Sequence, residues 1–285
     1  MVRIAYLGPP GTFSEDALLA AVGDRVVETV PRSTFYEAIV AVTEGEADRA
    51  LVPFENSIEG SVRATLDALA FDAPSVRIVG EYDLAVTHNL IARAEIELED
   101  VEVVVSHPQA NAQCARFIRE SLPNAEARGA PSTAEAVRLV SESDRPWAAL
   151  GGISAATLYG AVVLREGIED EPDNVTRFVW VAPEGTEASG EGAWRTTLIF
   201  SELGADHPGA LVDALTEFSR REVNLTRIES RPRRRGLGSY MFFVDLEGRD
   251  SDPVVAEAIE ALRGKAESVR VLGSYPIEAP GVPGL

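Results

Sequence analysis

The sequence predicts an α/β protein made of two folding units, and three observations support this prediction. At 285 residues, of which 45% are hydrophobic, the chain is long for one simple domain and can bury substantial cores. Short β-rich runs alternate with amphipathic helical stretches from the N-terminus onward. Residues 183–193 are rich in Gly and Glu, include Pro183 and Ser189, and lack periodicity, which is typical of a linker. We therefore expect one unit over residues 1–182 and a second, separately folded unit over residues 194–285.

The N-terminal runs alternate between strand and helix, which predicts a sheet of largely parallel strands. The expected elements are, in order, residues 4–7, 15–22, 26–30, 35–43, 50–53 and 62–71. Helix starts are marked by capping boxes, in which a hydroxyl residue precedes Glu or Gln by three positions. Four such pairs occur: Thr12 with Glu15, Thr34 with Glu37, Ser106 with Gln109, and Ser132 with Glu135.

A second α/β block follows within the same unit. Its expected elements are a buried strand over 101–105, helices over 108–120 and 133–140, a strand over 148–150 and a closing strand over 177–181. The tail beyond the linker is expected to form strand 195–201, helix 209–221, strands 225–230 and 240–247, helix 253–263 and strand 269–274. This βαββαβ order is the split, ferredoxin-like arrangement. Asp206 and Asp252, each followed closely by proline, are expected to cap its two helices.

The charge and composition exclude several classes of protein. A net charge of −20 argues against binding nucleic acid, because such binding depends on basic residues that neutralise phosphates. With acidic residues abundant and Lys265 the only lysine, we expect a surface suited to concentrated salt, where the screening length falls to about 3 Å at 1 M. The composition therefore suggests a halophilic source.

Metal, disulfide and membrane chemistry are also unexpected. Cys114 is the only cysteine, so we expect a small buried side chain rather than a catalytic thiol. His88, His107 and His207 show no metal-ligand spacing. No secretory signal is visible and no apolar run approaches the roughly 18 residues that span a bilayer. These features predict a cytoplasmic protein without a metal.

Four polar loops are candidate parts of a functional site. Residues 8–14, 53–61 and 106–109 each follow an expected strand, and residues 173–178 open one. Loops beyond the carboxyl ends of strands tend to face the ligand crevice of an open sheet, and amides at a helix start attract anions. Each loop alone is equally well explained as a turn, a helix cap or a surface ion pair.

Together the four loops resemble prephenate dehydratase. The resemblance rests on Gly-Pro-Pro-Gly-Thr-Phe-Ser at 8–14, Pro-Phe-Glu-Asn-Ser-Ile-Glu-Gly-Ser at 53–61, Ser-His-Pro-Gln at 106–109 and Asn-Val-Thr-Arg-Phe at 174–178. Pro208-Gly-Ala-Leu211 and Glu229-Ser-Arg-Pro232 look like the ligand-binding segments of the ACT domain that is usually fused to it. The resemblance covers nearly the whole chain in the right order.

This resemblance implies a catalytic region of two α/β lobes, like a type 2 periplasmic binding protein, with prephenate between them. It implies a cofactor-free loss of water and carbon dioxide that gives phenylpyruvate. Thr176 would assist departure of the hydroxyl, with Glu55 as an alternative acid, Asn56 beside them and Arg177 as a charge partner. The other expected substrate contacts are Thr12, Ser14, Ser57, Ser106, Gln109, Gln113, Asn174 and Phe178.

The ACT-like tail implies feedback control by phenylalanine at an interface between two such domains. The expected effector contacts are Pro208, Gly209, Ala210, Leu211, Asn224, Glu229, Ser230, Arg231 and Pro232. A pocket shared by two subunits predicts a homodimer or a homotetramer. Two other functions stay open: an arogenate dehydratase, which performs the same elimination on an amino substrate, and a non-catalytic amino-acid sensor.

Overall fold

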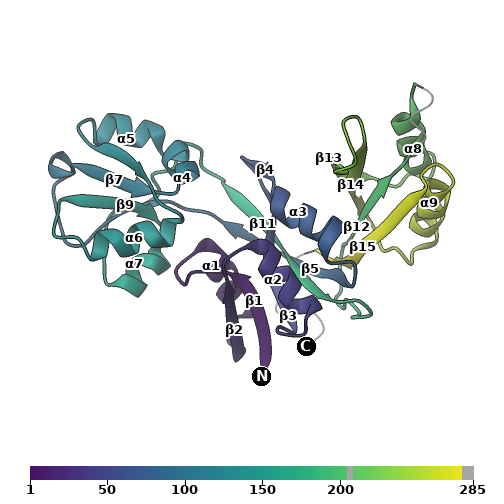
Figure 1. Ribbon diagram of the computed structural model, residues 1–285, viewed down its shortest axis with the longest axis horizontal. Coiled ribbons are helices and arrows are strands. Elements are labelled where there is room, and N and C mark those ends of the chain that lie inside the picture. Colours follow the sequence, from purple (N-terminus) through teal and green to yellow (C-terminus); the bar gives the residue numbers. More distant parts are fainter. Residues whose placement is uncertain (204–207, 278–285) are drawn as a thin grey trace.

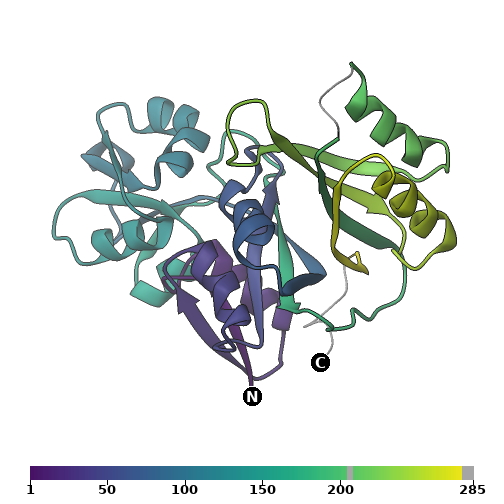
Figure 2. The ribbon, with the colours of Figure 1, turned by 45° about the vertical axis from the view of Figure 1, so that its right-hand side comes forward.

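The computed structural model describes residues 1–203 and 208–277, whose strands form three sheets. Two α/β lobes and a C-terminal domain lie in a row, with the first lobe in the middle (Figure 1). The view turned by 45° shows the same three bodies (Figure 2). The described residues include no helix with the length and apolarity needed to cross a membrane.

The first lobe holds a mixed sheet of order β2-β1-β3-β11-β5, with the short β4 paired to β3. Its strands are β1 (Val2–Leu7), β2 (Val27–Arg32), β3 (Arg49–Asn56), β4 (Gly60–Ser61), β5 (Val76–Ala85) and β11 (Val175–Pro183). Its helices are α1 (Phe13–Val22), α2 (Phe35–Thr43), α3 (Arg63–Asp67) and the π-helical turn η1 (Ala68–Asp72). β1 runs parallel to β2 and β3, whereas β11 runs antiparallel to β3 and β5.

The second lobe holds a mixed sheet of order β10-β6-β9-β7-β8. Its strands are β6 (Asn89–Ala92), β7 (Val103–Ser106), β8 (Glu126–Gly129), β9 (Trp147–Gly151) and β10 (Val162–Arg165). Its helices are the 3-10 turn η2 (Leu98–Asp100), α4 (Pro108–Gln113), α5 (Ala115–Ser121), α6 (Thr133–Ser141) and α7 (Ile153–Tyr159). The two-lobed arrangement implied by the resemblance is confirmed.

Two expectations about these sheets were wrong. The sheets are mixed rather than largely parallel, because the chain crosses between the lobes twice and returns in the opposite direction. The strand expected over 177–181 does not close the second block: it is β11, inserted between β3 and β5 of the first lobe. A β-rich run shows that a strand forms, but its partners lie far away in sequence.

The caps of three helices follow the capping-box prediction. The hydroxyls of Thr12, Thr34 and Ser132 accept hydrogen bonds from the amides three residues later. The fourth pair was wrong, because His107 rather than Ser106 caps α4, its ring nitrogen accepting from the amide of Gln109 at 3.3 Å. The predicted helix 108–120 breaks at Cys114, a buried residue with burial raising the pKa of its thiol to about 12.

The C-terminal domain confirms the βαββαβ order. It consists of β12 (Trp194–Ser201), α8 (Ala210–Ser219), β13 (Leu225–Pro232), β14 (Tyr240–Glu247), α9 (Pro253–Arg263) and β15 (Ser268–Pro276), with sheet order β13-β14-β12-β15. Asp252 occupies the N-cap position of α9, but its carboxylate accepts from the amide of Arg249 instead of a helix amide. Asp206, like His207, lies outside the described residues.

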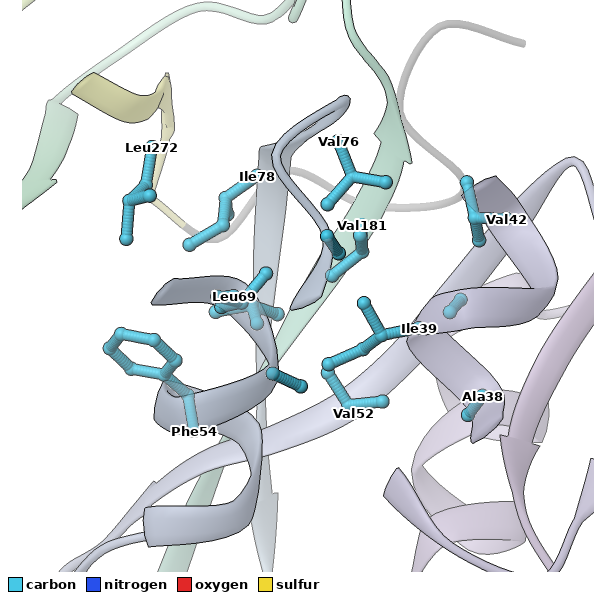
Figure 3. Packing of buried hydrophobic residues seen from close by; sticks show 14 of the residues in the cluster. Ala38, Ile39, Val42, Val52, Phe54, Leu69, Val76, Ile78, Val181 and Leu272 are labelled. Atoms are coloured by element: carbon cyan, nitrogen blue, oxygen red, sulfur yellow. The ribbon is translucent and has the colours of Figure 1, made fainter. Parts of the chain in front are cut away.

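The C-terminal sheet is covered on both faces, by its own helices on one and by the first lobe on the other. Met241, Phe243, Leu272 and Tyr275 pack into one buried cluster with Phe54, Leu69 and Ile78 of the first lobe. Leu272 points toward Ile78 and Leu69 in the close view (Figure 3). The helices α8 and α9 cover the other face. The C-terminal sheet is therefore anchored on the lobe that carries β11.

Candidate functional site

A cavity of about 370 Å³ lies between the two lobes. It is lined by Leu7, Thr12, Phe13, Ser14, Phe35, Pro53, Asn56, Val62, Val86, His88, His107, Gln109, Ala110, Gln113, Pro131, Ser132, Thr133, Asn174, Thr176 and Phe178. Its size falls in the range of about 300 to 1,000 Å³ that is common for small-molecule sites. The four polar loops therefore meet around one cavity.

The ends of α1, α2 and α6 explain why polar groups gather there. Thr12, Phe35 and Ser132 lie at or beside the N-termini of these helices, and all three line the cavity. A helix N-terminus carries partial positive charge and amides without intrahelical partners, so it favours anions. Of the described residues that line the cavity, none is Lys, Arg, Asp or Glu. An anion here is thus held by dipoles, hydroxyls and amides.

Asn56 determines which groups donate and which accept in a series of hydrogen bonds along the cavity wall. Its Oδ1 accepts from the backbone amides of Ile58 and Glu59, at 3.0 and 2.9 Å. Because both bonds need an acceptor, the side-chain nitrogen must face the other way. That Nδ2 donates to Asn174 Oδ1 at 2.6 Å and to Thr176 Oγ1 at 2.9 Å.

The Thr176 hydroxyl therefore receives a hydrogen bond and keeps its own proton for another partner. A hydroxyl has one donor and two acceptor positions, and Asn56 occupies one acceptor position. Thr176 lines the cavity and is 9% exposed. A hydroxyl that accepts one hydrogen bond also becomes a better donor in the next. The geometry equips Thr176 to donate into the cavity.

The same reasoning extends to His88. Asn174 uses its Oδ1 for Asn56, so its Nδ2 donates to Gln113 Oε1 at 3.3 Å. The ring nitrogen His88 Nε2 lies 3.0 Å from the same oxygen, which makes it a donor, while Gln113 Nε2 donates to Glu59. His88 Nδ1 is then a bare, buried acceptor without a partner. Burial lowers the pKa of His88, which favours the neutral ring.

Eight of the expected site residues line the cavity. These are Thr12, Ser14, Asn56, Gln109, Gln113, Asn174, Thr176 and Phe178. Ser57 is outside the wall, because its hydroxyl and amide join the end of β3 to Val175 at the start of β11. Ser106 is fully buried and donates to the carbonyl of Leu150, which joins β7 to β9.

Glu55 and Arg177, which were expected to take part in the site, do not line this cavity. Successive residues of a strand face opposite sides, so Thr176 and Asn56 turn toward the cavity while Arg177 and Glu55 turn away. Arg177 binds Asp245 of the C-terminal domain at 2.6 Å, Glu55 at 2.9 Å and Glu81 at 3.3 Å. Burial works to lower the pKa of Arg177, but Asp245 and the other acidic neighbours raise it above its ordinary value.

Comparison with known proteins decides the family. A model of the family described as prephenate dehydratase matches residues 4–186, and a model of the ACT domain matches residues 197–264. The chain belongs to the prephenate dehydratase family.

The family relatives match over almost the whole chain. A prephenate dehydratase of Mycobacterium sp. strain JLS is 44% identical over 99% of this chain and 92% of its own length. The solved structure of prephenate dehydratase from Arthrobacter aurescens in complex with L-Phe is 40% identical, with a TM-score of 0.88 over 99% of this chain and 93% of that one. A protein described as GqqA, a novel type of quorum quenching acylase, is 32% identical with a TM-score of 0.85, covering 97% and 98%. The fold is therefore shared by proteins that are described with different activities.

In the ACT domain, the expected effector residues lie at both ends of the sheet. Pro208 and the N-cap residue Gly209 precede Ala210 and Leu211, the first residues of α8, which follows the end of β12 where Ser201 pairs with Met241. The segment Glu229, Ser230, Arg231 and Pro232 ends β13 at the same side. Asn224 precedes β13 at the opposite end, about 25 Å away at 3.3 Å per strand residue. Arg231 also pairs with Asp67 of the first lobe at 2.7 Å, so its guanidinium is already occupied.

Sequence reasoning missed several lining residues of this prephenate dehydratase fold. His88 lies in the segment that connects β5 of the first lobe to β6 of the second. Its ring makes an edge-to-face contact with Phe13 at the start of α1. No local pattern marks it. Ser132 and Thr133 were identified only as a helix start, although they follow β8 (Glu126–Gly129) as the other candidate loops follow their strands. The strand-end argument that selected residues 106–109 would have selected them also.

Proposed function

We propose that this chain is a prephenate dehydratase, converting prephenate into phenylpyruvate, carbon dioxide and water, with phenylalanine as the effector of its ACT domain. The observation that carries the proposal is the free proton of Thr176 on the wall of a cavity between the lobes that is lined by no Lys, Arg, Asp or Glu among the described residues. Family membership over nearly the full length supports it. We further propose three units, residues 1–182, 183–193 and 194–285, the middle one linking the catalytic region to the ACT domain.

The reaction needs only groups that the protein and the solvent supply. The ring carbon–oxygen bond breaks with its electrons leaving on the hydroxyl. The bond to the ring carboxylate breaks and its electrons complete the aromatic ring, while one proton from the solvent converts the departing hydroxide to water. Aromatisation supplies the driving force, so the protein has to orient the substrate and stabilise charge on the leaving oxygen.

Thr176 is assigned to that leaving oxygen. A threonine hydroxyl is a poor acid, so we assign it a hydrogen bond that strengthens as negative charge develops, rather than net loss of its proton. Asn56 supports this role by occupying an acceptor position of the hydroxyl. Thr12, Ser14, Gln109 and Gln113 line the same cavity and are the proposed contacts of the substrate carboxylates. Glu55, which faces away from the cavity, is not assigned a proton.

The uncharged wall favours prephenate over arogenate. The arogenate side chain carries an ammonium group, which is costly to bury without a carboxylate partner. None of the described lining residues is Asp or Glu, so the wall offers no carboxylate to an ammonium group. The pyruvyl group of prephenate carries no ammonium and needs no such partner. We expect kcat/KM to be higher for prephenate when both substrates are assayed side by side. The opposite order would assign the chain to the amino substrate.

The deciding experiment measures phenylpyruvate formed from prephenate by the wild-type protein and by Thr176→Val. Removing one preorganised donor to a developing oxyanion costs about 10² to 10³ in kcat. We expect that loss with little change in KM. Thr157→Val removes a hydroxyl from an exposed position of α7 and serves as the matched control. A wild-type protein that leaves prephenate unchanged would refute the proposed activity, and an unimpaired Thr176→Val would remove Thr176 from the mechanism.

We also propose that the protein is cytoplasmic and assembles as a homodimer or a homotetramer. Asn224 lies too far from Pro208–Leu211 within one chain for both to touch one small ligand. Two ACT domains placed side by side in opposite directions bring the two ends of the sheet together. Sedimentation with and without phenylalanine tests this proposal. A monomer at all concentrations, with activity indifferent to millimolar phenylalanine, contradicts it.

A further inference from the structure

The interface between the first lobe and the C-terminal domain buries a cluster of charged side chains. Arg177 binds Asp245, Glu55 and Glu81; Arg195 binds Glu81 at 2.7 Å; and Arg227 approaches Glu55 at 3.6 Å. Three cations thus face three anions. Burying such groups costs much free energy, and removing one partner of such a pair leaves an uncompensated buried charge.

Asp245 holds the most enclosed position in this charge cluster. Its side chain is 1% exposed, compared with 9% for Arg177. One oxygen binds Arg177 at 2.6 Å, and the other accepts from the hydroxyl of Thr197 at 2.8 Å. The Thr197 hydroxyl in turn lies 2.7 Å from that of Tyr275. Asp245 is therefore held by β12 and β15 and has little freedom to move.

Arg177 transmits this constraint to the cavity, because it adjoins Thr176 in β11. The pairing of β11 with β3 changes register between Arg177 and Phe178, where Phe54 is the extra residue. Bulges of this kind alter the direction in which neighbouring side chains point. The Phe54 ring lies beneath both Arg177 and Arg227, with guanidinium carbons 5.1 and 4.8 Å from its centre. Thr176 thus sits one residue from a bulge that the C-terminal domain holds in place.

We propose that Asp245 is a positioning residue for the reaction: through Arg177 it sets the place of the Thr176 hydroxyl, so the C-terminal domain takes part in building the active site. This inference rests on the proposed function of Thr176 and adds a residue from another domain to it. Asp245 touches no substrate. The ACT domain is therefore connected to the Thr176 hydroxyl through the ion pair between Asp245 and Arg177 and through the peptide bond between Arg177 and Thr176.

Asp245→Asn tests the proposal, because it removes the charge and keeps the shape. A displacement of about 1 Å in a catalytic group can cost about 10²-fold in rate, so we expect kcat to fall about 10- to 100-fold with KM little changed. Asp67→Asn is the matched control: it weakens two other ion pairs of the same interface, those of Asp67 with Arg231 and Arg234, neither of which involves β11. We expect Asp67→Asn to retain the wild-type kcat.

A double-mutant cycle separates positioning from loss of stability. If Asp245 acts through Arg177, then Arg177→Met with Asp245→Asn lowers kcat no further than Arg177→Met alone. Thr197→Val, which removes only the second hydrogen bond of Asp245, is a milder variant and should lower kcat by a smaller factor. It covers the case in which Asp245→Asn does not fold.

The outcomes distinguish this inference from the proposed function. An inactive wild-type protein refutes the activity itself. If the wild-type protein is active, three results overturn the positioning role of Asp245. These are equal losses of kcat in Asp245→Asn and Asp67→Asn, additive losses of kcat in the double-mutant cycle, and an effect of Asp245→Asn on KM alone.

Discussion

At the scale of single residues, the decisive property is the orientation of the Asn56 amide. Two backbone amides hold its oxygen, and this alone directs its nitrogen to Thr176 and Asn174. A carboxylate in the same place would accept the Thr176 proton instead of donating to its oxygen. The free proton on which the proposed mechanism depends would then be lost.

Asn56→Asp should therefore lower kcat about as far as loss of the Thr176 hydroxyl, about 10²-fold or more. Steady-state kinetics on prephenate measure this. Because both changes remove the same hydrogen bond to the leaving oxygen, the double variant with Thr176→Val should be no slower than Thr176→Val alone. Additive losses would show that Asn56 acts independently of Thr176.

His88 predicts a particular dependence of stability on pH. Burial lowers its pKa below the ordinary value of 6.5, while Gln113 and the nearby Glu169 work to raise it. Below pH 6.5 the unfolded chain gains a proton that the folded chain refuses, so stability falls as pH falls toward the folded-state pKa. The slope for one proton is at most about 1.4 kcal/mol per pH unit. Above pH 6.5 this contribution is fully present.

The comparison of His88→Phe with the wild type isolates this contribution. We expect urea unfolding to show a shallower loss of stability between pH 6.5 and 5 in the variant. Buried Glu81 and Asp16 also have raised pKa values, because burial disfavours their charged forms, but they are present in both proteins and cancel in the difference. Identical slopes in the two proteins would mean that His88 titrates normally.

At the scale of elements, the contact between β15 and β5 determines how the C-terminal domain sits on the first lobe. A Cβ at Gly273 would lie 2.0 Å from the carbonyl oxygen of Ile78 and 2.8 Å from its carbonyl carbon. These are backbone atoms, so the conflict cannot be relieved by rotating a side chain. Glycine is required here by the close approach of two strands.

Gly273→Ala should destabilise the protein by about 3 kcal/mol, the upper end of the usual cost of overpacking a core, or by more. Urea unfolding measures the change. Gly129→Ala is the control, since its Cβ would meet only Pro108 Cγ at 3.9 Å, an ordinary contact. Equal stability of the two variants would show that the interface between the strands yields easily.

At the scale of the whole molecule, the net charge of −20 acts on every domain at once. Self-repulsion of such a surface opposes the compact state, and salt screens it, with a Debye length of about 10 Å at 0.1 M and about 3 Å at 1 M. We propose on this ground that the protein is adapted to concentrated salt.

The thermal midpoint and kcat should accordingly both be higher in molar KCl than in dilute buffer. Screening depends on ionic strength, so NaCl at the same concentration should act similarly. A midpoint that stays constant or falls between 0.1 and 2 M KCl would contradict the halophilic adaptation.

Much of the secondary structure followed from the sequence. The strand at 240–247 and the helices at 35–43 and 253–263 have the predicted bounds, because periodicity and capping are local properties of the chain. Eight of the expected substrate contacts also line the cavity, because loops at strand ends meet at one edge of a sheet. The resemblance supplied the family, and the ACT order β12 to β15 followed from the succession of runs.

Tertiary structure alone decided where β11 pairs, and with it the separation of Thr176 from Arg177. The sequence presents these neighbours as one motif, but strand alternation assigns their side chains to opposite faces, and only the partners of β11 determine which face is the cavity. The same holds for Asp245, which is 68 residues from Arg177 in the chain and 2.6 Å from it in space. Local sequence determines elements, whereas contacts between distant residues determine which side of each element performs the chemistry.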